Sequence, residues 1–161
     1  MLNTIKAEIC DLTHDNLKLI YQWRFKDYRL FFATQYIPTL QDHEEFINNE
    51  LIEGSVSWFF GYFQGEIASC CSITKHSKEK KSHISKMTLG RVMVDPRWKG
   101  KGFAKQTISY GIKYMTQSTK KYEITLEVLN TNTSAMILYK KLGFVAVKFA
   151  DHTTTMVLKK G

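Results

Sequence analysis

The stretch VMVDPRWKGKGFA, residues 92–104, decides the fold of this chain. It opens with apolar, largely β-branched residues that are typical of a strand, and Asp95-Pro96 ends that strand. A basic loop with two glycines follows, and from Phe103 onward apolar residues recur at the spacing of a helix. The stretch therefore predicts a strand, a glycine loop and a helix in direct succession.

This junction has the properties of an anion-binding site. Gly100 and Gly102 let backbone N–H groups approach a ligand, because no Cβ stands in the way. Unpaired N–H groups at the start of a helix attract anions, and Arg97, Lys99 and Lys101 add positive charge there. We expect a phosphate or pyrophosphate at this place. The spacing is not that of a P-loop NTPase, and the third glycine of dinucleotide-binding folds is missing.

A second motif follows further along the chain, where Asn132, Ala135, Tyr139 and Gly143-Phe144 come after an expected strand. The two motifs together resemble the signatures of the GNAT acetyltransferase superfamily, Arg/Gln-x-x-Gly-x-Gly/Ala and Asn-x-x-Ala/Ser-x-x-x-Tyr-x-x-x-Gly-Phe. The resemblance rests on specific motifs within residues 84–148. In the rest of the chain only the order of the expected strands and helices is similar.

The resemblance implies acetyl-CoA as co-substrate, held where two strands splay apart. The residues expected to contact it are Val92, Met93, Val94, Arg97, Lys99, Gly100, Lys101, Gly102, Phe103, Ala104, Asn132 and Tyr139. It also implies that Tyr139 protonates the departing thiolate, a task that suits a phenol because its pKa near 10 lies close to that of a thiol. A backbone N–H near Val94 is expected to stabilise the oxyanion.

The general base is harder to assign, because the carboxylate that many relatives carry before the cofactor loop is absent from residues 86–91. Glu127, on the following strand, is the candidate for the second catalytic residue. Ser72, His83 and a chain of water molecules are the alternatives.

The remaining sequence completes a mixed α/β (α+β) pattern. Strands are expected at 6–10, 56–63, 66–74, 84–94, 124–129, 144–148 and 154–158. Helices are expected after Thr13 and after Thr39, each as N-cap, and at 103–115 and 133–142. With the resemblance, this order predicts a GNAT fold: a central mixed, mostly antiparallel sheet flanked by helices, with splayed strands at the cofactor site. Since no linker divides the 161 residues, we expect one domain, 1–161.

The acceptor is expected to bind to the first half of the chain. Trp23-Arg24, His43-x-x-Phe46 and residues 72–75 are similar to segments of GNAT members that acetylate amino sugars linked to nucleotides, such as the pseudaminic-acid pathway enzyme. A guanidinium group fits phosphate oxygens bidentately. Arg24, His43 and Ser72 are therefore the expected substrate-binding residues.

Other acceptors remain open. The same Trp-Arg pattern occurs in relatives that acetylate the N-termini of ribosomal proteins. Polyamines, antibiotics and amino acids are further alternatives, although a polyamine would favour an acidic pocket. A binding module that uses the scaffold without catalysis, for example on RNA, belongs to a different class of function.

The net charge of +8 favours an anionic partner. The basic segment 75–81 contains no interleaved aromatic residue, so nucleic acid is not the expected partner. No apolar run approaches the roughly 18 residues that span a bilayer, and no secretion signal is visible, so we expect a cytoplasmic protein without a membrane partner. The sequence is compatible with a homodimer. Cys10, Cys70 and Cys71 lack metal-ligand spacing, so we expect buried apolar side chains and no metal.

Overall fold

A seven-stranded sheet runs through the protein in the order β1-β2-β3-β4-β5-β7-β6. The computed structural model describes residues 4–10, 13–26, 39–52, 55–77 and 82–161. The strands are Lys6–Cys10 (β1), Val56–Phe63 (β2), Glu66–Lys75 (β3), Ser85–Val94 (β4), Tyr122–Leu129 (β5), Val145–Phe149 (β6) and Thr153–Lys160 (β7). Neighbouring strands are antiparallel except β4 and β5, which run parallel.

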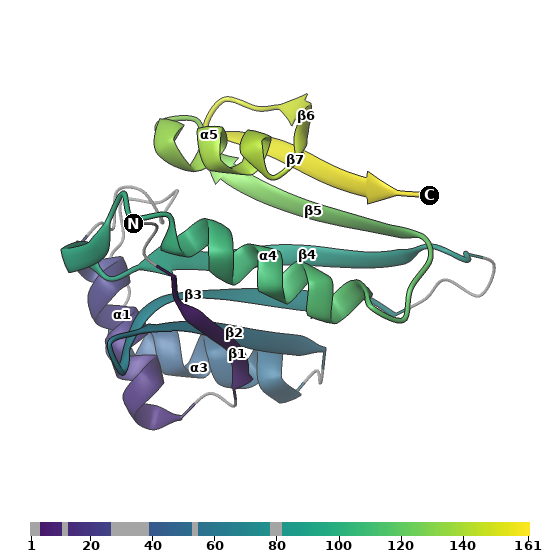
Figure 1. Ribbon diagram of the computed structural model, residues 1–161. Helices are drawn as coiled ribbons and strands as arrows, with labels where there is room; N and C mark the ends of the chain where they lie inside the picture. The colour runs from purple at the N-terminus through teal and green to yellow at the C-terminus, as the bar shows by residue number, and fades with distance from the viewer. Residues whose placement is uncertain (1–3, 11–12, 27–38, 53–54, 78–81) are drawn as a thin grey trace.

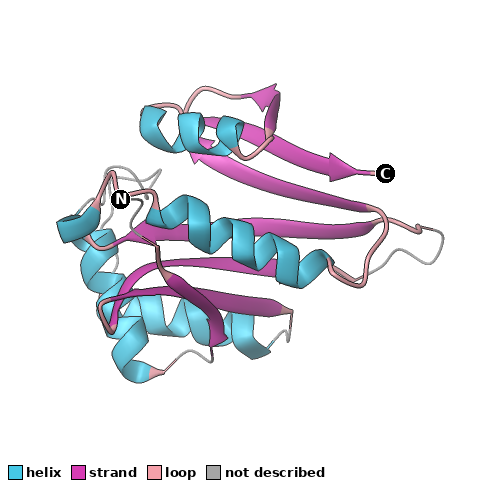
Figure 2. Cartoon of the chain, viewed as in Figure 1, coloured by secondary structure: helices cyan, strands magenta, loops and turns pink. Residues whose placement is uncertain are grey.

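Helices cover both faces of this sheet, as Figures 1 and 2 show. They are His14–Lys26 (α1), Leu40–Ile52 (α3), Phe103–Thr116 (α4) and Thr133–Lys141 (α5), with a short 3-10 turn, Pro96–Trp98 (η1), before α4. The α1 and α3 helices pack on one face, and α4 and α5 on the other. None of the helices in the described ranges is long and apolar enough to cross a bilayer.

Alternating side chains of the central strands build the two larger of three hydrophobic clusters, one on each face. In β2, Phe59 packs under α4 and α5, whereas Trp58 and Phe60 pack under α1. The adjacent thiols divide in the same way, since Cys71 belongs to the first core and Cys70 to the second. Both are fully buried and free, so the expectation of buried, apolar side chains is confirmed for them. Cys10 is only partly buried, and its Sγ lies 3.6 Å from the Tyr62 hydroxyl oxygen.

The expected helix starts are present in the described residues. Thr13 Oγ1 accepts a hydrogen bond from Asn16 N at 3.2 Å. At α3 the bonds are reciprocal: Asp42 N donates to Thr39 Oγ1 at 3.1 Å, and Thr39 N donates to an Asp42 carboxylate oxygen at 2.8 Å. The η1 turn, centred on Arg97, was not expected. It arises because Asp95 caps it and Pro96 occupies its first position.

Gly61 lets α4 approach β2 closely. A Cβ added there would overlap the side chains of Ile5, Ser69 and Thr107. We expect Gly61→Ala to lower the free energy of unfolding by about 1–3 kcal/mol, because the overpacked contact forces neighbours off their rotamers. Urea denaturation measures this, and an unchanged midpoint would contradict the close packing of α4 on β2.

Candidate active site

The two parallel strands at the centre of the sheet separate toward their carboxyl ends. Their pairing covers only residues 85–88 of β4 and 122–125 of β5. Figure 1 shows the strands diverging toward the end at which α4 begins. A cavity of about 720 Å³ lies there, lined by the ends of β4 and β5, the start of α4, the length of α5 and the end of α1. The expected splayed strands are therefore present.

Most of the site residues expected from the sequence line this cavity. They are Arg24, Val92, Met93, Val94, Lys99, Gly100, Gly102, Phe103, Ala104, Glu127, Asn132 and Tyr139. Arg97, Lys101, His43 and Ser72 do not line it. His43 contacts Arg24 and Ser72 contacts Arg91, and both of these arginines line the cavity. His43 and Ser72 therefore support lining residues without lining the cavity themselves.

The loop before α4 presents its backbone to the cavity. Gly100 and Gly102 have φ of 77° and 80°, in the left-handed region that favours glycine. Gly102 caps the helix, and its carbonyl accepts from Gln106 N at 3.3 Å. The N–H groups of residues 103–105 therefore precede the first helical hydrogen bond, which leaves them at the positive end of the helix dipole. A Cβ at either glycine would meet open space, so the backbone is accessible from that side.

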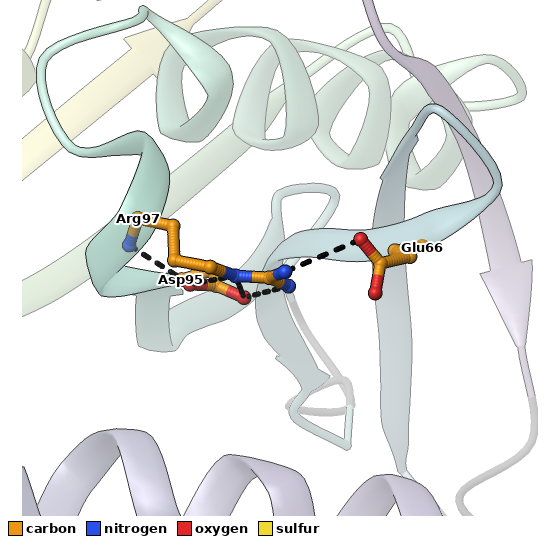
Figure 3. A network of polar contacts seen from close by, with 3 residues as sticks. All are labelled: Glu66, Asp95 and Arg97. Atoms are coloured by element: carbon orange, nitrogen blue, oxygen red, sulfur yellow. Dashed lines mark hydrogen bonds and ion pairs between the residues drawn. The ribbon is translucent and has the colours of Figure 1, made fainter.

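Arg97 forms ion pairs with two carboxylates, as Figure 3 shows. Its Nη2 lies 2.7 Å from an Asp95 carboxylate oxygen, and its Nη1 lies 3.3 Å from Glu66 Oε2. The guanidinium also stacks over the ring of Trp98, 4.4 Å from its centroid. Burial raises the pKa of Asp95, but the hydrogen bonds and charge of Arg97 outweigh it, so that this pKa lies below its ordinary value. Contact between Arg97 and the donor stays a prediction.

Tyr139 is 7% exposed and lines the cavity from the last turn of α5. The helix ends in a Schellman motif: Gly143 N donates to Lys140 O and Phe144 N donates to Tyr139 O, both at 3.0 Å. Gly143 has a φ of 96°, which explains why a glycine stands four residues after the tyrosine. Burial raises the pKa of Tyr139, with a further contribution from Cys71, so the hydroxyl stays protonated at neutral pH.

Asn132 and Glu127 are the other two candidates from the segment that contains β5 and α5. The Asn132 side chain caps α5, accepting from Ala135 N at 3.3 Å, so its oxygen has a structural role beside any contact with a ligand. Glu127 is exposed and lies between Leu126 and Val128, which face the core under α4 and α5. Because side chains alternate along a strand, Glu127 lies on the face that α1 and α3 cover.

A bulge in β4 adds a residue that the sequence did not indicate. Cys70 pairs with Met93 but Ser72 pairs with Gly90, so Cys71 faces two residues, Arg91 and Val92. Arg91 has a φ of 50°, which is uncommon for a long side chain. Its guanidinium lies 5.5 Å from the centre of the Trp58 ring, its Nη1 donates to Ser72 Oγ at 3.1 Å, and it lines the cavity. A bulge leaves no local pattern in a sequence, and this one was missed.

On the same face Arg24 extends from α1 into the cavity wall. Its Nη1 lies 3.3 Å from His43 Nδ1, and since a guanidinium only donates, the imidazole accepts there and carries its proton on Nε2. His43 is 4% exposed. Burial, then the charges of Arg24 and Arg91, lower the pKa of His43 to about 4, so it is neutral at pH 7.

The residues present fit an acyl-CoA thioester. Within the described ranges no strand pairs with the edge of residues 92–94 that faces β5, so this edge offers backbone groups to an extended arm. The accessible amides at the start of α4 offer donors to a diphosphate. Asp95 N donates to Ala68 O of β3 at 2.8 Å. Successive amides of a strand point to opposite edges, so the Val94 N–H points to the cavity edge.

Solved structures of acetyltransferases share this architecture. The chain is similar to Campylobacter jejuni N-acetyltransferase PseH in complex with acetyl coenzyme A, with a TM-score of 0.66 and 18% identity over 98% of this chain and 99% of that one. It is similar to spermidine N-acetyltransferase from Vibrio cholerae in complex with CoA and spermine, with a TM-score of 0.72 and 18% identity over 96% and 95%. An acetyltransferase from Thermus thermophilus gives a TM-score of 0.73 and 13% identity over 98% and 99%.

At these identities the structural likeness shows the fold, and no curated protein sequence matches the chain. The family follows from the sequence itself. Residues 17–144 match the profile of the acetyltransferase (GNAT) family, which covers most of the chain. The chain belongs to the GNAT acetyltransferase family, and it is an N-acetyltransferase that takes its acetyl group from acetyl-CoA.

Proposed function

We propose that the acetyl group goes to the primary amine of an amino sugar linked to a nucleotide. The observation that carries this proposal is that Arg24 lines the same cavity as Glu127 and Tyr139. Arg24 comes from the face that α1 and α3 cover, which we call the acceptor side. A guanidinium binds diphosphate oxygens in a fork, which suits a nucleotide-linked sugar. The similarity of Trp23-Arg24 and His43 to acetyltransferases of that substrate class supports the same acceptor.

In this proposal the backbone holds the donor. The N–H groups from Lys99 to Ala104, apart from that of Lys101, which donates to Trp98 O at 3.3 Å, hold its diphosphate. The edge of β4 that β5 leaves uncovered pairs with its pantetheine arm. Acetyl-CoA supplies a thioester carbonyl that an amine can attack. The N–H of Val94, aimed at the cavity edge, is the proposed oxyanion donor.

Two side chains are proposed to move the protons. Glu127 accepts the proton of the acceptor amine, directly or through a water molecule, so that the nitrogen attacks in its neutral form. Tyr139 donates its hydroxyl proton to the departing thiolate. The raised pKa of Tyr139 keeps its hydroxyl protonated before the reaction. It also makes proton transfer to the thiolate less favourable than from an ordinary phenol, so the close match to a thiol pKa that the sequence led us to expect is not present in this structure.

A polyamine is the competing small acceptor, since the Vibrio cholerae neighbour is a spermidine N-acetyltransferase. Spermidine carries several positive charges, and Arg24 and Arg91 both line this cavity. Like charges repel, so the wall composition favours an anionic acceptor over a polycation.

Release of CoA in the presence of acetyl-CoA and different amines tests the proposal. The panel holds a nucleoside-diphosphate-linked amino sugar, a ribosomal-protein N-terminal peptide and spermidine. We expect turnover with the amino sugar, and we expect Arg24→Ala to raise the KM for this acceptor roughly tenfold or more while the KM for acetyl-CoA stays unchanged. Turnover confined to the peptide or to spermidine would contradict the proposed acceptor.

A further inference from the structure

The bulge in β4 places a second arginine on the acceptor side of the cavity. Without the bulge, Arg91 would follow Met87 and Leu89 into the core under α4. The extra residue changes the face, so that Met93 packs in the other core, under α1. Arg91 contacts Ser72 and Trp58, which belong to that second face. The unusual backbone of Arg91 thus brings a guanidinium to the face on which the acceptor is proposed to bind.

The Arg91 side chain is held in a defined place. The ring of Trp58 is 2% exposed and Ser72 is 1% exposed, so the cation rests on rigid, buried neighbours. Ser72 Oγ accepts from Arg91 Nη1 at 3.1 Å and also donates to Gly90 O at 3.3 Å, which fixes the hydroxyl between the two strands. A residue kept in a left-handed backbone conformation by such packing is a frequent feature of ligand sites.

Arg24 reaches the same region from α1, where His43 supports it. Both arginines line the cavity, and burial followed by the charges of Arg24 and Arg91 lowers the pKa of His43. Burial raises the pKa of Cys70 to about 12, and the charges of the same two arginines oppose that rise. The two guanidinium groups therefore act on the same buried neighbours although they come from different elements. Arg97 does not line the cavity, and its guanidinium forms ion pairs with Asp95 and Glu66.

From this arrangement we propose that Arg24 and Arg91 together bind an anionic group of the acceptor, so that the acetylated amine belongs to a molecule carrying a phosphate or a carboxylate, and that Arg91 is a specificity-determining residue. The inference rests on the proposed transfer to an amine in this cavity. Ser72 and His43 are positioning residues in this scheme, because they hold the guanidinium groups through neutral acceptors. Glu127, exposed on the same face, is then available to the amine end of the acceptor.

Calorimetric binding to the protein saturated with CoA tests the inference, because the donor's own phosphate site is then filled. The probes are UDP-glucosamine, glucosamine 6-phosphate, glutamate and glucosamine, which separate diphosphate, phosphate, carboxylate and no anion. We expect at least one anionic probe to bind tenfold or more tightly than glucosamine. Preference for the phosphates or for glutamate identifies which anion the acceptor carries.

Two variants test Arg91 itself. Arg91→Gln removes the charge and keeps a long side chain, whereas Arg91→Gly suits the left-handed backbone and protects the fold. We expect each to weaken binding of the preferred anion by about tenfold to a hundredfold, with affinity for glucosamine unchanged. Lys113→Gln, which removes one exposed positive charge on α4 outside the cavity, is the matched control and should bind like the wild type.

The outcomes separate the two proposals. Equal affinity for glucosamine and for every anionic probe, or unchanged anion binding in both Arg91 variants, overturns the inference about Arg91. CoA release is then measured with acetyl-CoA and the same amines. Tight anion binding without acetyl transfer to any phosphorylated amino sugar would contradict the proposed acceptor and leave the anion subsite standing. If both Arg91 variants still acetylate such a sugar at wild-type KM, the proposed acceptor stands and the inference about Arg91 is overturned.

Discussion

Gly102→Asp is expected to weaken acetyl-CoA binding by roughly 100-fold or more, equivalent to about 3 kcal/mol. Gly102 caps α4 with a φ of 80°, directly before the amides that are proposed to hold the diphosphate. An aspartate there carries a negative charge toward phosphate oxygens, and its Cβ strains the left-handed backbone. Isothermal titration with acetyl-CoA measures the loss.

Gly65→Asp is the matched control for backbone strain and added charge. Gly65 also has a φ of 80° with open space beside it, but it lies in the turn between β2 and β3, outside the cavity wall. Both variants should lose a similar free energy of unfolding, about 1–2 kcal/mol. Only Gly102→Asp should lose affinity for acetyl-CoA, and Gly65→Asp should bind it like the wild type. Wild-type affinity in Gly102→Asp would refute the placement of the diphosphate at this loop.

Tyr139→Phe is expected to lower kcat by about 100-fold and to leave the affinity for acetyl-CoA nearly unchanged. General acid catalysis contributes about 10²–10⁴ to a rate, and the phenylalanine keeps the ring that packs against Phe144 at 6.0 Å between centroids. Steady-state kinetics together with a direct titration of acetyl-CoA separates the two effects.

Tyr110→Phe provides the comparison, because it removes a phenol from α4 that packs on Phe59 and does not line the cavity. It should keep the wild-type kcat. If Tyr139→Phe instead bound acetyl-CoA far more weakly and turned over normally, Tyr139 would be a binding residue and the thiolate would receive its proton from elsewhere.

Much of the fold could be read from the sequence because local rules determine it. The strands Lys6–Cys10 and Val56–Phe63 have the bounds that their apolar and β-branched residues predicted. Thr13 and Thr39 cap the helices that they were expected to cap. The strand order could not be read in this way, since pairing β4 with β5 and β5 with β7 depends on packing between distant segments.

The site was predictable where its residues belong to motifs and hidden where tertiary structure determines it. Gly102 and Tyr139 stand in short patterns with a local geometric reason, a helix start and a Schellman motif. Arg91 depends on a bulge that shifts the register against β3, which no local pattern announces. Arg97 stands in the motif, but its partner Glu66 is distant in sequence, so the ion pair that holds it could not be foreseen.

A crystal structure of the protein with acetyl-CoA tests the central claim most directly. We expect the diphosphate to accept hydrogen bonds from the backbone amides between Gly100 and Ala104, with the pantetheine arm along the free edge of β4 and the thioester beside Tyr139. Density for the donor outside the opening between β4 and β5, or a thioester directed away from the Tyr139 hydroxyl, would contradict the account.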